Sequence, residues 1–199
     1  YELLELLLTY AIPRCDVKPL AKRLLANFGN TYNVVNAPIE SLKTVKGISD
    51  NTAIFIKTIN SIMTAGSRDY LRDTPIFHDY TKLAEYCKLL LSGKMIEEFH
   101  ILYLDTDYRL IADDLHSSGT IDWAAVYPRE IVKRVLDLNA RSIVMLHNHP
   151  TPNTSFSSQD IEITTEIKKI LATIDVDLFD HLLVSGNIVY SAKNMFLLK

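Results

Sequence analysis

The sequence has few cysteines and no long apolar segment, and each absence excludes a class of protein. Cys15 and Cys87 are its only thiols in 199 residues and have no paired spacing, which argues against a disulfide-stabilised secreted domain. We interpret both as packing residues in a reducing compartment. No apolar run reaches the roughly 18 residues that a membrane-spanning helix needs. The acidic start from Tyr1 to Glu5 does not resemble a signal peptide. We therefore expect a cytoplasmic protein with no membrane partner.

The chain also lacks an excess of positive charge. Its formal net charge is −3 at pH 7, so it has no general attraction to nucleic acid. Residues 1–70 carry 8 Lys and Arg against 6 Asp and Glu, whereas residues 71–199 carry 13 against 18. Any contact with DNA would therefore have to come from the first part, where the basic excess is small.

The first part of the chain has the pattern of short helices. The spacing of apolar residues and the positions of Pro and Gly predict helices over 2–10, 17–27, 39–45 and 50–63, with a short turn at 33–37. Residues 47–49 predict a turn between the last two helices. Residues 64–78 lose the helical period and contain Gly66 and Pro75, so we place a domain boundary there. The predicted domains are 1–66 and 76–199.

The second part mixes helices and strands. Helices are predicted at 80–91, 128–139 and 161–174, and strands at 99–105, 110–115, 141–147, 180–185 and 188–191. The predicted class is therefore α+β, preceded by a small all-α domain.

Two histidines follow directly on the most apolar of these strands. Residues 143–146 predict a buried strand that runs into His147-Asn148-His149. Alternate residues of an extended chain point to the same side, so His147 and His149 face one point in space. Such a pair is often only a strand end, and by itself it is a weak signal for a metal.

A carboxylate at the start of the next helix completes a set of ligands. Ser157 or Ser158 is a typical helix cap, which puts Asp160 in the first turn, where the helix dipole favours an ionised carboxylate. Two imidazoles and one carboxylate suit Zn²⁺, and three protein ligands leave the fourth position to water. We predict a catalytic zinc site at His147, His149 and Asp160.

Hydrolysis at such a site needs further groups. Water bound to zinc ionises near pH 7, and a general base must accept its proton. Glu97 or Glu98, just ahead of the predicted strand 99–105, is suitably placed in the sequence, and Ser157 could donate to an oxyanion.

The segment HNHPTPNTSFSSQD (147–160) resembles the JAMM motif of JAB/MPN-type metalloproteases. More closely, the chain resembles the bacterial RadC (UPF0758) family. Similar segments include EEFHILYLDTDYRLI (97–111), VYPREIVKRVLDLNA (126–140) and DHLLVSG (180–186), and residues 1–66 resemble that family's helix-hairpin-helix domain.

This resemblance implies a cytidine-deaminase-like α-β-α sandwich and a zinc-dependent peptidase or isopeptidase. It implies that His147, His149 and Asp160 bind Zn²⁺, that Glu97 is the general base, with Glu98 as the fallback, and that Ser157 is the oxyanion donor. One departure is that Pro150-Thr151-Pro152 replaces the family's usual Pro-Ser-Gly, which stiffens the loop beside the metal.

Two other functions stay open at this stage. A DNA-associated, repair-linked protein is suggested by the helix-hairpin-helix resemblance, with a weak DNA contact near Lys46. A non-catalytic MPN-like scaffold is disfavoured because the ligand set is intact. Of the other histidines, we interpret His181 as structural rather than as a partner of the metal site, and His100 and His116 as surface or edge residues.

Overall fold

The computed structural model describes residues 1–119, 126–150 and 154–198, and the chain divides into two compact units, Tyr1–Ala65 and Gly66–Lys199. The described part contains no helix with both the length and the apolar character required to cross a bilayer.

The first unit is entirely helical. Its helices are α1 (Glu2–Ala11), α2 (Lys18–Phe28), α3 (Thr31–Asn36), α4 (Ile39–Lys43) and the first part of α5 (Asp50–Asp73). They enclose a small core whose most buried members include Leu8, Leu24, Leu42 and Ile56. The turn predicted at 33–37 is wrong, because α3 covers most of it, with the side chain of Asn30 accepting a hydrogen bond from the N–H of Asn33.

The turn before α5 contains Gly47 in the left-handed region, with φ +101°. The Arg23 guanidinium donates to the carbonyl of Lys46 from Nε and Nη2, at 3.2 and 3.0 Å. A Cβ at Gly47 would lie 3.2 Å from Arg23, so both the backbone angle and the space favour glycine here. Whether this turn functions as in helix-hairpin-helix proteins stays a prediction.

Residues 64–73 continue α5 as a helix, so the irregular segment predicted there is wrong. Gly66 costs only about 1 kcal/mol relative to Ala in a helix, and packing at the far end compensates for it. Leu71 is 1% exposed and joins Ile76 in the core of the second unit.

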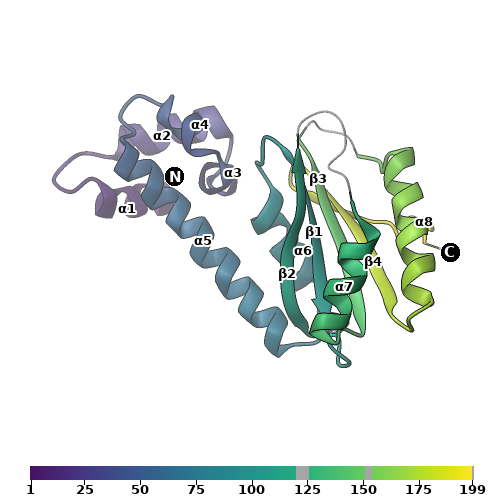
Figure 1. Cartoon of the computed structure of the whole chain (residues 1–199). Helices are drawn as coiled ribbons and strands as arrows, with labels where there is room; N and C mark the ends of the chain where they lie inside the picture. The colour runs from purple at the N-terminus through teal and green to yellow at the C-terminus, as the bar shows by residue number, and fades with distance from the viewer. Residues whose placement is uncertain (120–125, 151–153, 199) are drawn as a thin grey trace. The chain divides into compact units, whose positions relative to one another are not determined.

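The second unit is a five-stranded sheet with helices on both faces (Figure 1). The strand order is β2-β1-β3-β4-β5, with only β3 and β4 parallel. The strands are β1 (Glu97–Leu104), β2 (Leu110–Gly119), β3 (Ser142–His149), β4 (Asp177–Ser185) and β5 (Ile188–Ser191), and the helices are α6 (Tyr80–Leu91), α7 (Pro128–Leu138) and α8 (Ser158–Ala172).

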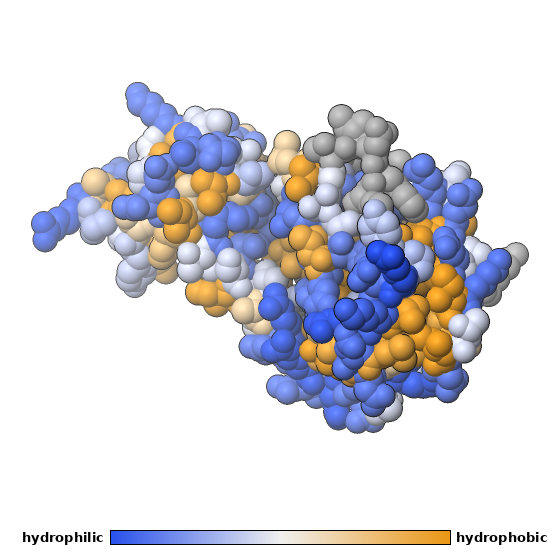
Figure 2. Space-filling model, in the orientation of Figure 1, coloured by the Kyte–Doolittle hydropathy of each residue, from blue (hydrophilic) through white to orange (hydrophobic). Residues whose placement is uncertain are grey.

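Alternation along the strands divides this unit into two cores. Leu102, Val144 and Leu182 face α6, whereas Ile101, Met145 and others face α7 and α8. Apolar residues also reach the surface beside α7 and α8 (Figure 2), where Leu136 is 62% exposed. The α-β-α sandwich confirms the predicted α+β class.

Strands β3 and β2 both end further along the chain than predicted. β3 continues through His149, so the two histidines lie on an extended backbone as expected. β2 continues to Gly119, four residues beyond its predicted end.

Candidate metal centre

The end of β3 and the start of α8 bring His147, His149 and Asp160 together. Nε2 of His147 lies 3.2 Å from Nε2 of His149. Asp160 approaches with Oδ1 3.3 Å from Nε2 of His147 and Oδ2 3.7 Å from Nε2 of His149. Within the described ranges, these three residues form the group of His, Cys, Asp and Glu side chains that could hold a metal ion.

The separations fit a tetrahedral zinc ion. With metal–ligand bonds of about 2.0–2.2 Å, two ligand atoms of a tetrahedron lie about 3.3–3.6 Å apart. The His147–His149 separation of 3.2 Å and the separation of 3.3 Å between His147 and Oδ1 of Asp160 lie close to this range, and the second oxygen of Asp160, Oδ2, lies 3.7 Å from His149. The side chains of His147, Asp160 and His149 are 0, 4 and 13% exposed, so the cluster opens to solvent beside His149. Three ligands and one open side can hold a metal and admit a further molecule.

Ser157 fixes Asp160 through a reciprocal helix cap. The N–H of Asp160 donates to Oγ of Ser157 at 3.1 Å, and the N–H and Oγ of Ser157 donate to Oδ2 of Asp160 at 2.6 and 2.7 Å. Of the two serines weighed from the sequence, Ser157 is therefore the cap. Its single hydroxyl proton points at Asp160 in this structure, so it is not already directed at an oxyanion.

Neighbouring side chains keep the carboxyl group of Asp160 ionised. Burial by itself would raise the pKa of this carboxyl, but hydrogen bonds from His147 and His149, together with Ser157, hold the pKa far below its usual range. A buried carboxylate that stays ionised is suited to a divalent cation.

His181 on β4 contacts the cluster from behind. Its Nε2 lies 2.8 Å from Nδ1 of His147, and its Nδ1 lies 2.6 Å from Oγ1 of Thr164 on α8. Complete burial, and after it the neighbouring His147, lower the pKa of His181 well below its usual value, so the ring is neutral. His181 is buried and hydrogen-bonded, as expected of a structural histidine, but its partner is a candidate metal ligand, which the sequence did not show.

Two aromatic rings enclose the histidines. Phe99 stacks against His147 with ring centroids 5.9 Å apart and 13° between the planes. Phe156 lies edge-on, 5.9 Å from His147 and 5.1 Å from His181. These apolar walls restrict the imidazoles to the positions from which they reach the cluster.

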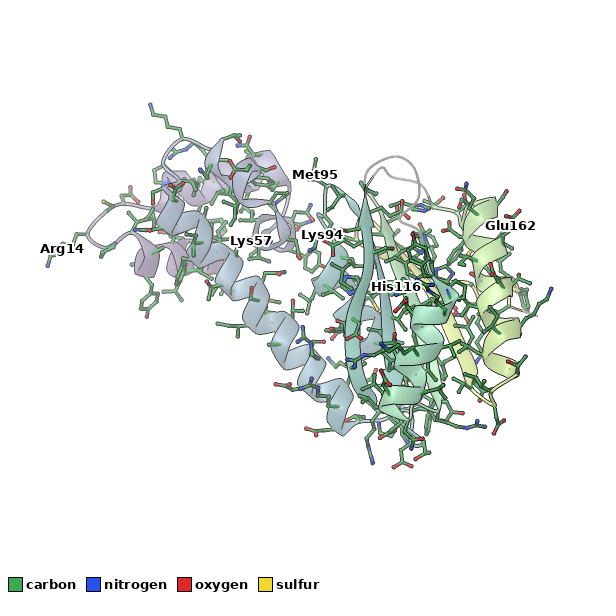
Figure 3. The ribbon with its side chains drawn as sticks, in the orientation of Figure 1. Arg14, Lys57, Lys94, Met95, His116 and Glu162 are labelled. Atoms are coloured by element: carbon green, nitrogen blue, oxygen red, sulfur yellow. The ribbon has the colours of Figure 1, made fainter. Side chains whose placement is uncertain are left out.

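The strand register separates the two candidate bases. Phe99 pairs with His147 across β1 and β3. This is the last pair of the β1–β3 register, and extending that register by two residues would place Glu97 opposite His149, on the same face of the sheet as Phe99 and His147. Glu98 points to the opposite face, where it binds Lys94 at 2.9 Å and His100 at 3.2 Å (Lys94 is labelled in Figure 3).

Behind β1, His100 is buried between two carboxylates, so its interpretation as a surface residue is wrong. Its Nδ1 lies 2.9 Å from Asp113, and its Nε2 lies 3.2 Å from Glu98. Burial would raise the pKa of both carboxyls, but the hydrogen bonds from Lys94 and His100 to Glu98, and from His100 to Asp113, lower both pKa values. The contacts extend to Tyr86, which hydrogen-bonds Asp113.

The other residues singled out in the sequence lie away from the candidate metal centre or outside the described residues. His116 lies on the edge strand β2 (Figure 3) and accepts a hydrogen bond from the N–H of Tyr127 at 3.1 Å, as expected of an edge residue. Thr151 and Pro152, the departure noted in the metal-site loop, lie outside the described residues. Cys87 is buried as expected, but Cys15 is exposed and does not pack in a core.

The second unit is a RadC-like JAB domain, because residues 77–197 match the model of that family. The chain belongs to this family. It is 38% identical to a UPF0758 protein of Fusobacterium nucleatum over 198 residues, covering 96% of this chain and 85% of that protein. It is 37% identical to a UPF0758 protein of Ruegeria pomeroyi over 193 residues, covering 97% and 86%.

Proposed function

We propose that this protein is a zinc-dependent hydrolase of amide bonds, a peptidase or isopeptidase. The observation that carries the proposal is that His147, His149 and Asp160 each offer a ligand atom within 4.8 Å of one another, in a cluster that is most exposed at His149. Two imidazoles and one carboxylate are a ligand set typical of catalytic zinc sites. When bound, zinc would polarise a carbonyl group and supply a water that ionises near neutral pH.

The protein's own groups would handle the protons. Glu97, opposite His149 by register, would accept a proton from the attacking water and return it to the leaving amine, a task typical of a positioned carboxylate. The face occupied by Glu98 and its binding to Lys94 and His100 argue against Glu98 in this role.

Ser157 would act in two ways. It caps α8 and so holds Asp160, and it would donate to the oxyanion once its hydroxyl turns away from Oδ2 of Asp160, 2.7 Å away. Loss of one such donor typically slows amide hydrolysis by about 10²–10³-fold. A peptide or isopeptide is the substrate class that this chemistry serves.

The first test is the metal content of the purified full chain, measured by mass spectrometry. We expect about one zinc per chain in the wild type, none in His149→Ala, and the wild-type value in Glu162→Gln, which removes an exposed carboxylate from α8 (labelled in Figure 3). Absence of zinc from the wild type, even after zinc is added and excess removed by dialysis, would overturn the proposed site and favour a scaffold.

The second test separates metal binding from catalysis. Against a panel of peptides and isopeptides, we expect Glu97→Gln to retain zinc and to lose activity by about 10²–10⁴-fold. Glu162→Gln should keep full activity. An authentic hydrolytic activity that survives Glu97→Gln or His147→Ala unchanged contradicts the mechanism.

A DNA contact through the helical unit stays a prediction. The turn at Gly47 leads into the start of α5, where backbone N–H groups favour phosphate. Lys43 is already paired, however, at 2.9 Å from Asp50 and 3.8 Å from Glu40. Binding that weakens with salt and falls in Lys46→Ala would support this contact, and no binding at low salt would remove it.

A further inference from the structure

A line of hydrogen-bonding side chains runs behind the proposed metal site, and we propose that His181 and Thr164 are positioning residues that set the tautomer of His147. The line starts at Nδ1 of His147, passes 2.8 Å to Nε2 of His181, and continues 2.6 Å from Nδ1 of His181 to Oγ1 of Thr164. It ends where Oγ1 of Thr164 donates to the backbone carbonyl of Asp160. The inference rests on the proposed metal site.

The end of the line determines the direction of every hydrogen bond in it. The Asp160 carbonyl can only accept, so the hydroxyl proton of Thr164 lies between the two closely approaching oxygens. Oγ1 of Thr164 must then accept from Nδ1–H of His181. A neutral imidazole has one N–H, so Nε2 of His181 accepts and Nδ1 of His147 donates.

In the neutral form of His147, which is the form that binds a metal, this direction leaves Nε2 without a proton and directs its lone pair at the cluster. Nε2 is the atom that lies 3.2 Å from His149 and 3.3 Å from Asp160. A metal ion needs that lone pair, and the other tautomer would present a proton to it instead. The line therefore favours, for neutral His147, the tautomer that a cation needs.

Burial keeps water, the usual competitor, away from these hydrogen bonds. His147 and His181 are both 0% exposed and Thr164 is 3% exposed, and Phe156 lies against both rings. Water cannot substitute for a missing partner without displacing this packing. The line also ends on the main chain of Asp160, so one chain of hydrogen bonds links two of the three proposed ligands from their rear sides.

The experiment uses the full chain and compares variants at two neighbouring threonines. Thr164→Val keeps the shape of the side chain but removes the acceptor for Nδ1–H of His181, and Thr164→Ser restores a hydroxyl. Thr165→Val is the matched control, since Thr165 is exposed on the next position of α8 and donates to the carbonyl of Ile161 at 2.8 Å. Zinc affinity is measured by competition with a chromogenic chelator, and folding is checked by circular dichroism.

We expect Thr164→Val to bind zinc about 10–100-fold more weakly than the wild type, as is typical when the hydrogen-bond partner of a ligand is disturbed. Thr164→Ser and Thr165→Val should bind within about threefold of the wild type. If the wild type binds zinc and folded Thr164→Val binds it equally well, the inference is wrong while the proposed metal site stands.

A second readout needs no metal. Nitrogen-15 NMR of the imidazoles in the metal-free protein reports which nitrogen of His147 carries the proton. We expect Nδ1–H in the wild type and a change in Thr164→Val. If the wild type failed to bind zinc, the proposed function would fall, but Nδ1–H would still support the hydrogen-bond line. At a pH where His147 is neutral, a proton on Nε2 of this ring in the metal-free wild type would overturn it.

Discussion

The side-chain carbonyl of Asn148 accepts a hydrogen bond from the backbone N–H of Glu98, at 2.9 Å. The amide nitrogen of the same side chain donates to the carbonyl of Ile96 at 3.0 Å. Asn148 thus holds the main chain on both sides of Glu97, from the strand that also carries His147 and His149. It is 2% exposed, and its role was not visible in the sequence, where it only separates the two histidines.

The two hydrogen bonds of the Asn148 side chain, which we call the Asn148 clamp, predict a local effect of Asn148→Ala. Removing a buried acceptor costs about 1–3 kcal/mol, so we expect the amide of Glu98 to exchange with deuterium about 10–100-fold faster. Asn194→Ala, at an exposed position, is the control and should leave that amide unchanged. Unchanged exchange at Glu98 in Asn148→Ala would show that the clamp does not hold the strand.

The cap of α8 predicts different outcomes for two adjacent serines. Ser157→Ala removes the group that accepts from Asp160 N–H, so the metal-free protein should lose about 1 kcal/mol of unfolding free energy. Ser158→Ala, at an exposed position, should change it by less than about 0.5 kcal/mol. Urea denaturation distinguishes them, and equal effects would contradict the assignment of the cap.

Substitutions of the two neighbouring glutamates should have different effects on stability. Glu98→Gln removes the carboxylate that pairs with Lys94 and one of the two that contact His100, so we expect a loss of about 1–3 kcal/mol of unfolding free energy. Glu97→Gln should be clearly less destabilising, because its proposed task is catalytic. Thermal or chemical denaturation decides between them, and the reverse order of stabilities would place the structural role at Glu97.

His181 predicts how the stability of the metal-free protein depends on pH. Burial lowers its pKa in the folded state, so the unfolded chain takes up a proton below about pH 6.5 while the folded chain does not. The unfolding free energy should therefore fall as the pH drops below this value, with a contribution of up to about 1.4 kcal/mol per pH unit.

The variant that tests this contribution is His181→Gln, measured with a chelator present. Its stability should fall less steeply than that of the wild type between about pH 6.5 and 5. His78→Gln, at an exposed position, should keep the wild-type slope. Equal slopes in His181→Gln and the wild type would mean that His181 is protonated in the folded protein.

The two cysteines should differ in reactivity. Cys15 is exposed, whereas Cys87 is buried in α6 and its burial raises the pKa of its thiol. Iodoacetamide at pH 8 should therefore add one group to the native protein and two to the unfolded protein, as counted by mass spectrometry. The native Cys15→Ser variant should gain no such group. Rapid labelling of Cys87 would contradict its burial.

Local sequence patterns were sufficient wherever neighbouring residues decide the outcome. The apolar run before His147 predicted the strand, and the two-residue period of that strand placed His147 and His149 on one side. Ser157 and Ser158 predicted a helix start, because capping depends only on adjacent backbone groups, and the structure identifies Ser157 as the cap. The strands and helices of the second unit were anticipated to within a few residues for the same reason, apart from β2, which runs four residues further.

Long-range packing decided what the patterns could not. Residues 64–73 lack a helical period, but Leu71 reaches a core built from distant segments, and α5 continues to it. The sequence predicted a surface or edge position for His100, because its partner Asp113 lies on the neighbouring strand and is 13 residues away in the chain.

The sequence by itself was sufficient to predict the candidate ligand set, since His147, His149 and Asp160 lie close along the chain on a strand and the helix that follows it. Only the tertiary structure decided which groups surround these ligands. The pairing of β1 with β3 put Glu97 rather than Glu98 on their face, and the parallel pairing of β3 with β4 brought His181 to His147. Strand register is a relation between segments up to 50 residues apart, and a one-residue shift would exchange the two faces.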